Sequence, residues 1–245
     1  QALEQMGCRV TGLYDELDGR FPNHHPDPTV VENLQDLIAT VREKKADVGI
    51  GYDGDADRIG AIDERGEILW GDRLMIVYAR DILTQRPGTT FISEVKASQC
   101  LYDDIAAKGG RPIMWKTGQS LMKAKLKAES AVLAGEMSGH MFFADRYFGF
   151  DDAIYASCRL DEILAKTKRS LSSLVADLPQ TTVTPEIRVD CPDTLKFQLV
   201  DQVRTQLAAY LAEGQPVGAS NLRMRELVTI DGVRVVIDAG LLRVP

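Results

Sequence analysis

Residues 51–58 have the sequence GYDGDADR and directly follow the apolar run ADVGI at residues 46–50. That run is short enough for a buried β-strand, and open α/β sheets tend to bind ligands beyond such strand ends. Asp53, Asp55 and Asp57 occupy alternate positions, and side chains two residues apart point the same way in an extended chain. Three carboxylates held together repel each other, and a bound cation is the simplest remedy. Oxygen ligands suit a hard ion such as Mg²⁺.

Two other interpretations compete with a metal site in this loop. An EF-hand starting at Asp53 would place Glu64 at its twelfth position, but Arg58 occupies the sixth position, which requires glycine, and both flanks resemble strands. A solvated acidic turn is the other interpretation, and the alternating spacing favours the metal over it. Arg58 forms a salt bridge within the loop or faces a phosphate beside the ion, because a guanidinium matches phosphate geometry.

Helical and strand patterns alternate on both sides of this loop. We expect strands at 8–14, 46–52, 58–63, 67–71, 90–95, 111–116, 131–136 and 140–144. We expect helices at 28–45, 72–84, 99–108, 120–128, 151–166 and 171–178, with Asp72 as the N-cap of the second. A separate α+β piece follows, which consists of residues 181–190, a helix at 195–212 and a hairpin at 227–237. The predicted fold class is α/β: consecutive mixed-sheet α/β domains, mostly parallel, followed by part of a smaller α+β domain.

Composition excludes several classes of protein. The chain has 245 residues, 44% hydrophobic and 27% charged, as in a globular protein. Its net charge of −7 argues against a nucleic-acid binder, and no apolar run approaches the ~20 residues of a membrane span. The four cysteines are scattered without a CxxC pair, which favours reduced, part-buried thiols of a cytoplasmic protein.

A second polar constellation is GEMSGH at residues 135–140, between two apolar strands. Glu136, Ser138 and His140 alternate, and together they suit the vicinal hydroxyls of a sugar. A polar loop that caps its own backbone is the competing interpretation. Two further candidates lie at strand ends: Lys96, and residues 116–120, KTGQS. The glycine in KTGQS lies at a strand-to-helix turn, which exposes backbone N–H groups to an anion. The competing interpretation of each lysine is an ordinary surface residue. We interpret His24 and His25 as structural loop residues.

Four motifs together resemble one family: GYDGDADR, GEMSGH, KTGQS and FPNHHPDP. The chain is similar to the α-D-phosphohexomutases, in the bacterial phosphomannomutase/phosphoglucomutase branch, over nearly its whole length. The resemblance implies a four-domain enzyme of carbohydrate metabolism that moves a phosphoryl group reversibly between hexose 1- and 6-phosphates. A phosphoserine and a bisphosphate intermediate carry the reaction. The expected partners are mannose and glucose phosphates and the 1,6-bisphosphate, with neither nucleic acid nor membrane.

The resemblance also implies roles for individual residues. The Mg²⁺ ligands would be Asp53, Asp55 and Asp57, with the phosphoserine as a further ligand. Catalytic roles would fall to Arg58, Lys96 and His140. The residues that bind substrate would be Lys96, Gln119, Glu136, Met137, Ser138, Gly139, His140 and Arg243.

The chain departs from the family pattern in three places. The serine motif, close to T-A-S-H-N-P, occurs nowhere. Gln119 stands where this branch usually has histidine, and Arg243 lacks the polar residues that should follow it. By resemblance we expect residues 1–67 to be the remaining part of domain 2, 68–179 to be domain 3, and 180–245 to be part of domain 4. We also expect the chain alone to be inactive, and a non-catalytic fragment that binds Mg²⁺ and sugar phosphate is the alternative.

Overall fold

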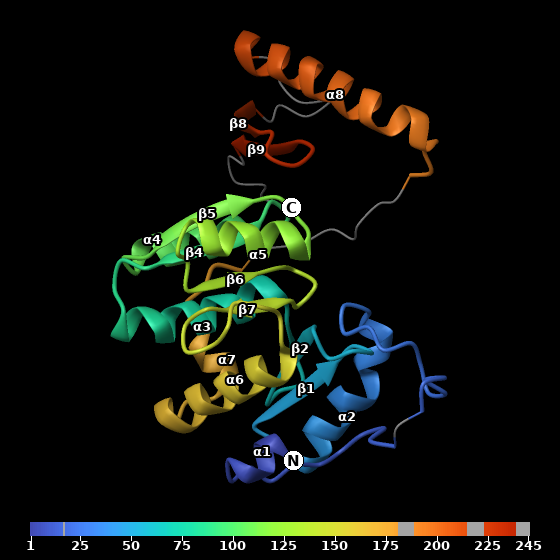
Figure 1. Ribbon diagram of the computed structural model, residues 1–245, viewed down its shortest axis with the longest axis vertical. Coiled ribbons are helices and arrows are strands. Elements are labelled where there is room, and N and C mark those ends of the chain that lie inside the picture. Colours follow the sequence, from blue (N-terminus) through green and yellow to red (C-terminus); the bar gives the residue numbers. More distant parts are fainter. Residues whose placement is uncertain (17, 181–188, 215–222, 239–245) are drawn as a thin grey trace, which may run out of the picture. The chain divides into compact units, whose positions relative to one another are not determined.

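The computed structural model of the protein describes residues 1–16, 18–180, 189–214 and 223–238. The chain divides into two compact units, Gln1–Pro179 and Gln180–Pro245 (Figure 1). The first unit contains two sheets and both of the polar constellations. No helix in the described ranges combines the length and the apolar character that crossing a membrane requires. The four cysteines are free and each is half-buried, as predicted.

The first sheet holds the aspartate loop. Strands β1 (Val48–Tyr52), β2 (Ile59–Asp63) and β3 (Ile68–Leu69) pair antiparallel in the order β1-β2-β3, and the loop 53–58 joins β1 to β2. The 3₁₀-helix η1 (Val31–Leu34) and helix α2 (Gln35–Lys44) precede them. The predicted helix at 28–45 therefore starts late. The Asp27 carboxylate accepts hydrogen bonds from the Thr29 N–H at 2.9 Å and hydroxyl at 2.7 Å, and such a local turn competes with a helix start.

The second sheet holds the other constellations. Its strands are β4 (Thr90–Glu94), β5 (Arg111–Trp115), β6 (Leu133–Gly135) and β7 (Met141–Phe143), in the order β5-β4-β6-β7. The first three are parallel and β7 is antiparallel to β6. The remaining helices are α1 (Ala2–Gln5), α3 (Gly71–Gln85), α4 (Gln99–Ala107), α5 (Gln119–Ala128), α6 (Ala153–Thr167) and α7 (Leu171–Leu174). The carboxyl ends of β4, β5 and β6 thus meet at one edge.

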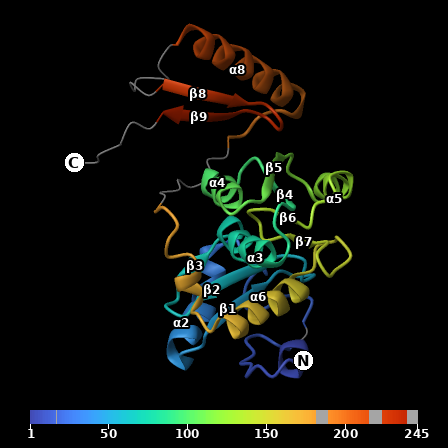
Figure 2. The ribbon, with the colours of Figure 1, turned by 90° about the vertical axis from the view of Figure 1, so that its left-hand side faces the viewer.

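Side chains alternate across this sheet as a two-residue period requires. The side packed against α3, α4 and α6 carries Phe91, Leu133 and Phe143. The opposite side, packed against α5, carries Ile92, Ala134 and Phe142. Residues of β2 belong to the same buried cluster as α3 and α6, so these two helices lie between the sheets (Figures 1 and 2). The outer face of the first sheet is covered by α2.

Other sequence-based expectations for the first unit were wrong as well. Residues 8–14 form no strand and pair with none of the described strands. A mostly parallel arrangement holds only for β4, β5 and β6, since the first sheet is antiparallel. Asp72 is not the N-cap of α3: that position is Trp70, and the Asp72 carboxylate accepts the Ser98 N–H at 3.1 Å instead.

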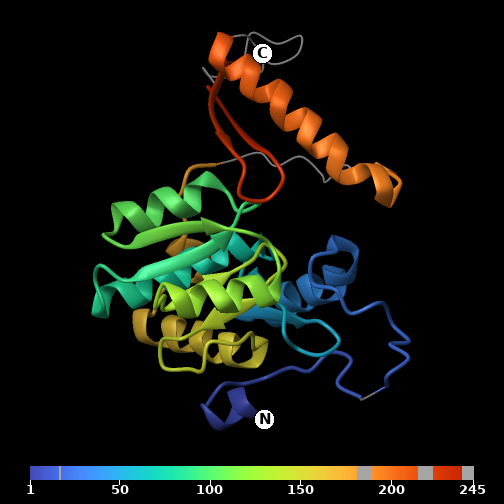
Figure 3. The same cartoon turned by 45° about the horizontal axis from the view of Figure 1, so that its top comes forward.

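The second unit is a helix and a hairpin. Helix α8 (Asp193–Glu213) contacts strand β8 (Arg223–Val228), which pairs antiparallel with β9 (Arg234–Asp238), as Figure 3 shows. The hairpin turn contains Gly232, whose φ of +62° suits a residue without a side chain. The predicted segment 181–190 falls mostly outside the described residues.

Candidate functional site

The three aspartates of the loop converge. One carboxylate oxygen from each of Asp53, Asp55 and Asp57 lies within 4.8 Å of the others. The cause is not the extended chain that the spacing suggested, because the loop is a tight turn. The Ala56 N–H donates to the carbonyl of Asp53 at 3.3 Å, and Ala56 has a φ of +59°. The small side chain at position 56 permits this left-handed residue, and the turn brings the carboxylates together.

The loop supplies part of its own charge compensation. The Asp53 carboxylate accepts the N–H groups of Asp57 at 3.0 Å and Arg58 at 3.1 Å, and the Arg58 side chain donates to it at 2.6 Å. Burial raises the pKa of Asp53, but these hydrogen bonds from Arg58 outweigh burial and lower it overall. Of the two roles open to Arg58, the structure contains the salt bridge, which also reaches Asp27 at 3.5 Å. A divalent ion is therefore not the sole remedy for the repulsion.

Asp57 and Asp55 differ from Asp53. Burial, together with the charges of Asp53 and Asp55, raises the pKa of Asp57, although His140 lowers it. Asp55 is exposed and forms no hydrogen bond or ion pair with any residue that the structure describes. Its carboxylate is thus available to an external ligand.

The GEMSGH residues form the turn between β6 and β7. The Nδ1 atom of His140 lies 2.9 Å from a Glu136 carboxylate oxygen and 2.8 Å from the Ser138 hydroxyl. The Glu136 N–H donates to the His140 carbonyl at 3.0 Å, which closes the turn. The three alternating side chains therefore form one hydrogen-bonded group.

The two polar loops meet although they belong to different sheets. The His140 Nε2 atom lies 3.2 Å from the Asp57 carboxylate. Arg58 and His140 form a backbone bridge, and the Ile59 N–H donates to the Gly139 carbonyl at 3.1 Å. One imidazole consequently links the acidic loop to the glutamate and serine of the other loop.

The turn before α5 contacts both loops. The Gly118 N–H donates to the Glu136 carboxylate at 2.9 Å, so the exposed N–H predicted to bind an anion binds a carboxylate of the protein itself. Gln119 donates to Asp151 and, at 3.4 Å, to Asp57. The Lys96 ammonium lies 3.6 Å from the Glu94 carboxylate. Gln119 thus contacts the acidic loop, and Lys96 contacts Glu94.

Sequence reasoning missed two carboxylates. Glu94 is fully buried at the end of β4. Asp151, whose side chain is 4% exposed, binds Gln119 and lies 3.2 Å from the Lys123 ammonium. Both were counted as ordinary members of a strand and a helix start. An acidic residue at the end of a predicted strand was the available signal for Glu94.

The other singled-out residues lie apart from this chemistry or outside the described part. Glu64 accepts the Ser172 hydroxyl at 2.5 Å, and the acidic loop has strands on both flanks, which excludes the EF-hand. The His24 Nδ1 atom lies 2.9 Å from the His25 carbonyl, consistent with a structural loop. Arg243 lies outside the described residues.

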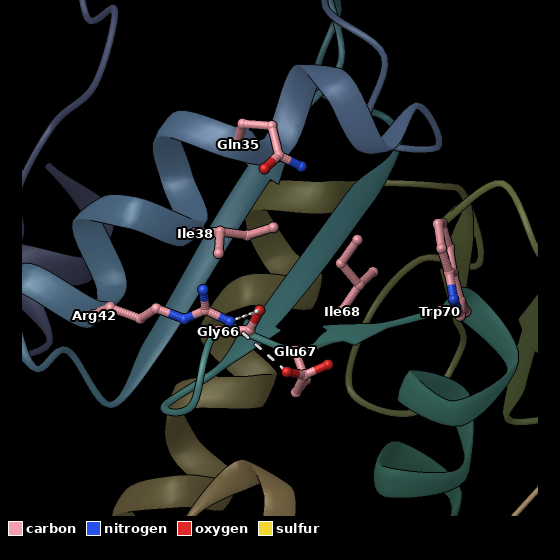
Figure 4. A pocket seen from close by; sticks show the side chains of 7 residues that line it. All are labelled: Gln35, Ile38, Arg42, Gly66, Glu67, Ile68 and Trp70. Carbon is pink, nitrogen blue, oxygen red and sulfur yellow. Dashed lines mark hydrogen bonds and ion pairs between the residues drawn. The ribbon is translucent and has the colours of Figure 1, made fainter.

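A separate hollow of about 340 Å³ lies between α2 and the β2–β3 hairpin (Figure 4). Its lining residues are Gln35, Ile38, Arg42, Gly66, Glu67, Ile68 and Trp70. The Arg42 guanidinium in it is already held by the hairpin, at 2.9 Å from the Arg65 carbonyl and 3.7 Å from the Glu67 carboxylate. We therefore place the candidate site at the convergent loops and not in this hollow.

His140 is expected to stabilise the fold more at mildly acidic pH than at alkaline pH. Burial lowers its pKa, but the Glu136 hydrogen bond and the Asp57 charge outweigh burial and raise it above 6.5. A raised folded-state pKa means that the stabilisation is complete below about pH 6.5 and is lost as the pH rises through the folded-state pKa. The Glu136 pKa is lowered despite its burial, mainly by the His140 hydrogen bond, so its carboxylate stays ionised at pH 6.

The measurement is urea unfolding of the unaltered protein and of His140→Gln in metal-free buffer between pH 6 and pH 9. The difference in unfolding free energy should shrink as the pH rises. A difference that is the same at every pH would contradict the raised pKa of His140.

Two family models match the chain. Residues 1–66 match the family model for phosphoglucomutase/phosphomannomutase alpha/beta/alpha domain II, and residues 70–182 match that for domain III. A phosphomannomutase/phosphoglucomutase of Pseudomonas putida is 47% identical over 235 residues, which are 96% of this chain and 48% of that protein. A phosphoglucomutase of Neisseria gonorrhoeae is 44% identical over 94% of this chain and 47% of that protein.

A solved structure shows the same fold. The crystal structure of a phosphoglucomutase/phosphomannomutase family protein from Burkholderia thailandensis superimposes with a TM-score of 0.82 at 41% identity, covering 95% of this chain and 46% of that one. The chain thus spans about half the length of the relatives it matches. The chain belongs to the phosphoglucomutase/phosphomannomutase family of the α-D-phosphohexomutases.

Proposed function

We propose that the convergent loops are the metal-binding and sugar-binding parts of a phosphomannomutase/phosphoglucomutase. The reaction is reversible phosphoryl transfer between hexose 1- and 6-phosphates through a phosphoserine and a bisphosphate. The observation that carries the proposal is the His140 imidazole, which lies 2.9 Å from Glu136 and 3.2 Å from Asp57 and so joins the two halves of one site. A shared site is required because metal, phosphate and sugar hydroxyls must be positioned together in phosphoryl transfer.

The acidic loop fits Mg²⁺. Octahedral Mg²⁺ binds oxygen at about 2.0–2.1 Å, so its ligand oxygens are separated by roughly 3–4 Å. The oxygens of Asp53, Asp55 and Asp57 are grouped within 4.8 Å, which small side-chain rotations bring into that range. When bound, the ion would neutralise charge on a phosphate oxygen. The Arg58 guanidinium, 26% exposed at the same loop, can then turn from Asp53 to the phosphate.

The other loop suits a sugar phosphate in either orientation. Glu136 accepts and Ser138 both donates and accepts, so the pair can bind neighbouring hydroxyls. Met137 and Gly139 are their neighbours in the same turn, and the Gln119 side chain contacts Asp57 and Asp151. The Lys96 ammonium, whose side chain is 56% exposed, provides positive charge for the distal phosphate. His140 holds a proton between Glu136 and Asp57. The imidazolium can donate this proton to a leaving oxygen, and the neutral imidazole can accept a proton from an attacking hydroxyl.

The proposal is tested by calorimetry and a coupled assay on the 245-residue chain. We expect Mg²⁺ and glucose 1,6-bisphosphate to bind. We expect turnover of glucose 1-phosphate to be essentially absent, because the sequence lacks the serine motif and removing a nucleophile costs orders of magnitude in rate. Binding without turnover supports the proposal. Normal turnover would refute the expected inactivity, and absence of both binding events would refute the site.

A further inference from the structure

Glu94 is a buried carboxylate with three partners on three different segments. Its side chain is fully buried at the end of β4. One of its oxygens accepts the Met137 N–H at 2.7 Å, and the other accepts the Thr117 hydroxyl at 2.7 Å. The Lys96 ammonium lies 3.6 Å from the second oxygen. The carboxylate therefore connects the segments that follow β4, β5 and β6.

Burying a carboxylate costs free energy unless hydrogen bonds or an opposite charge compensate it. The three partners of Glu94 supply that compensation. The partners are not core groups: Lys96 is a candidate site residue, Met137 lies between Glu136 and Ser138, and Thr117 precedes Gly118. Gly118 in turn donates to Glu136 at 2.9 Å. Glu94 and Glu136 thus both accept hydrogen bonds from the turn at 117–118, and Glu94 also accepts one from the turn that contains Glu136.

We propose that Glu94 is a positioning residue for the hexose phosphate, an inference that rests on the proposed function. Glu94 sets the Met137 backbone, and with it the Glu136 and Ser138 side chains, against the turn at 117–118. It also holds the Lys96 ammonium beside those side chains, where a phosphate of the substrate would meet it. Glu94 forms no hydrogen bond or ion pair with Asp53, Asp55 or Asp57 among the described residues, so its effect falls on the sugar and not on the metal.

Two substitutions separate its charge from its hydrogen bonds. In Glu94→Gln, the amide oxygen can accept the Met137 N–H and the amide nitrogen can donate to the Thr117 hydroxyl, so the turns stay in place while the ion pair with Lys96 is lost. In Glu94→Leu, both hydrogen bonds and the charge are lost. We expect the dissociation constant for glucose 1,6-bisphosphate to rise several-fold in the first variant and at least tenfold in the second. The dissociation constant for Mg²⁺ should stay within twofold in both.

The matched control is Tyr102→Phe. The Tyr102 hydroxyl donates to the backbone carbonyl of Glu94 at 2.7 Å, so its loss removes a buried hydrogen bond at the same strand end and spares the carboxylate. This variant should unfold at lower urea concentration and bind the bisphosphate like the unaltered chain. Equal bisphosphate affinity in Glu94→Leu and Tyr102→Phe, or an equal loss of Mg²⁺ affinity, would overturn the positioning role.

Hydrogen exchange at the Met137 amide tests the positioning role of Glu94 separately from the proposed function. If the unaltered chain binds no hexose phosphate, the proposed function fails, and the exchange rate still decides about Glu94. Exchange that becomes at least tenfold faster in Glu94→Leu, with unchanged exchange in the β2 strand, supports the local positioning role. An unchanged rate at Met137 overturns it.

Discussion

Asp55→Asn is expected to weaken Mg²⁺ binding at least tenfold without lowering the stability of the protein. Asp55 is the exposed member of the acidic trio and forms no hydrogen bond or ion pair within the described ranges. Asparagine keeps the shape and an oxygen ligand but removes one of three negative charges, and charge count sets the affinity of such sites. A tenfold loss corresponds to about 1.4 kcal/mol. The metal-free protein should gain slightly in stability, because repulsion with Asp57 falls.

The same substitution at Asp53 would be a poor test. The Asp53 carboxylate holds the N–H groups of Asp57 and Arg58, so its loss would disturb the turn as well as the ion. Glu32→Gln is the matched control, since it removes one exposed charge from the same unit outside the loop. Isothermal titration with Mg²⁺ should give unaltered affinity for that control. If Asp55→Asn binds Mg²⁺ as tightly as Glu32→Gln does, the acidic loop is not the metal site.

Local patterns predicted most of the fold. The apolar run before Asp53 forms β1, and the strands expected at 58–63 and 67–71 form β2 and β3. The parallel order of β4, β5 and β6 followed from the alternation of strands and helices. Residues 8–14 were the clear failure. Their β-branched and apolar character favours a strand, but a strand also needs a partner, and partner choice is a long-range property that a single segment does not contain.

The sequence indicated which residues belong to the candidate site better than it indicated how they are arranged in space. The alternating aspartates do meet, but a turn with Ala56 at positive φ brings them together instead of an extended chain. The contact of His140 with Asp57 joins residues 83 positions apart from two sheets. The role proposed for Glu94 depends on its contacts with the segments that follow β4, β5 and β6. Such contacts depend on the packing of the strand ends, which local sequence does not reveal.

Gly139 is the point at which this packing is most sensitive to substitution. Its φ is +98°, and a Cβ atom there would lie 2.4 Å from the Ile59 carbonyl oxygen and 3.0 Å from the Ile59 nitrogen. Both contacts are with backbone, so no side chain can rotate away. The Ile59 N–H also donates to the Gly139 carbonyl at 3.1 Å, so any displacement breaks the link between the two loops.

Gly139→Ala is therefore expected to destabilise the unit 1–179 by about 3 kcal/mol or more, since backbone strain and a steric clash add. Gly109→Ala is the matched control, because Gly109 has a φ of +82° but nothing within 4 Å of its added Cβ atom. It should cost only about 1 kcal/mol, the price of a left-handed non-glycine residue. Trp70 and Trp115 both lie in this unit, so their fluorescence during urea unfolding reports its stability. Similar losses in the two variants would show that β2 and the GEMSGH turn are not in the close contact described, and the shared site built on that contact would fail with it.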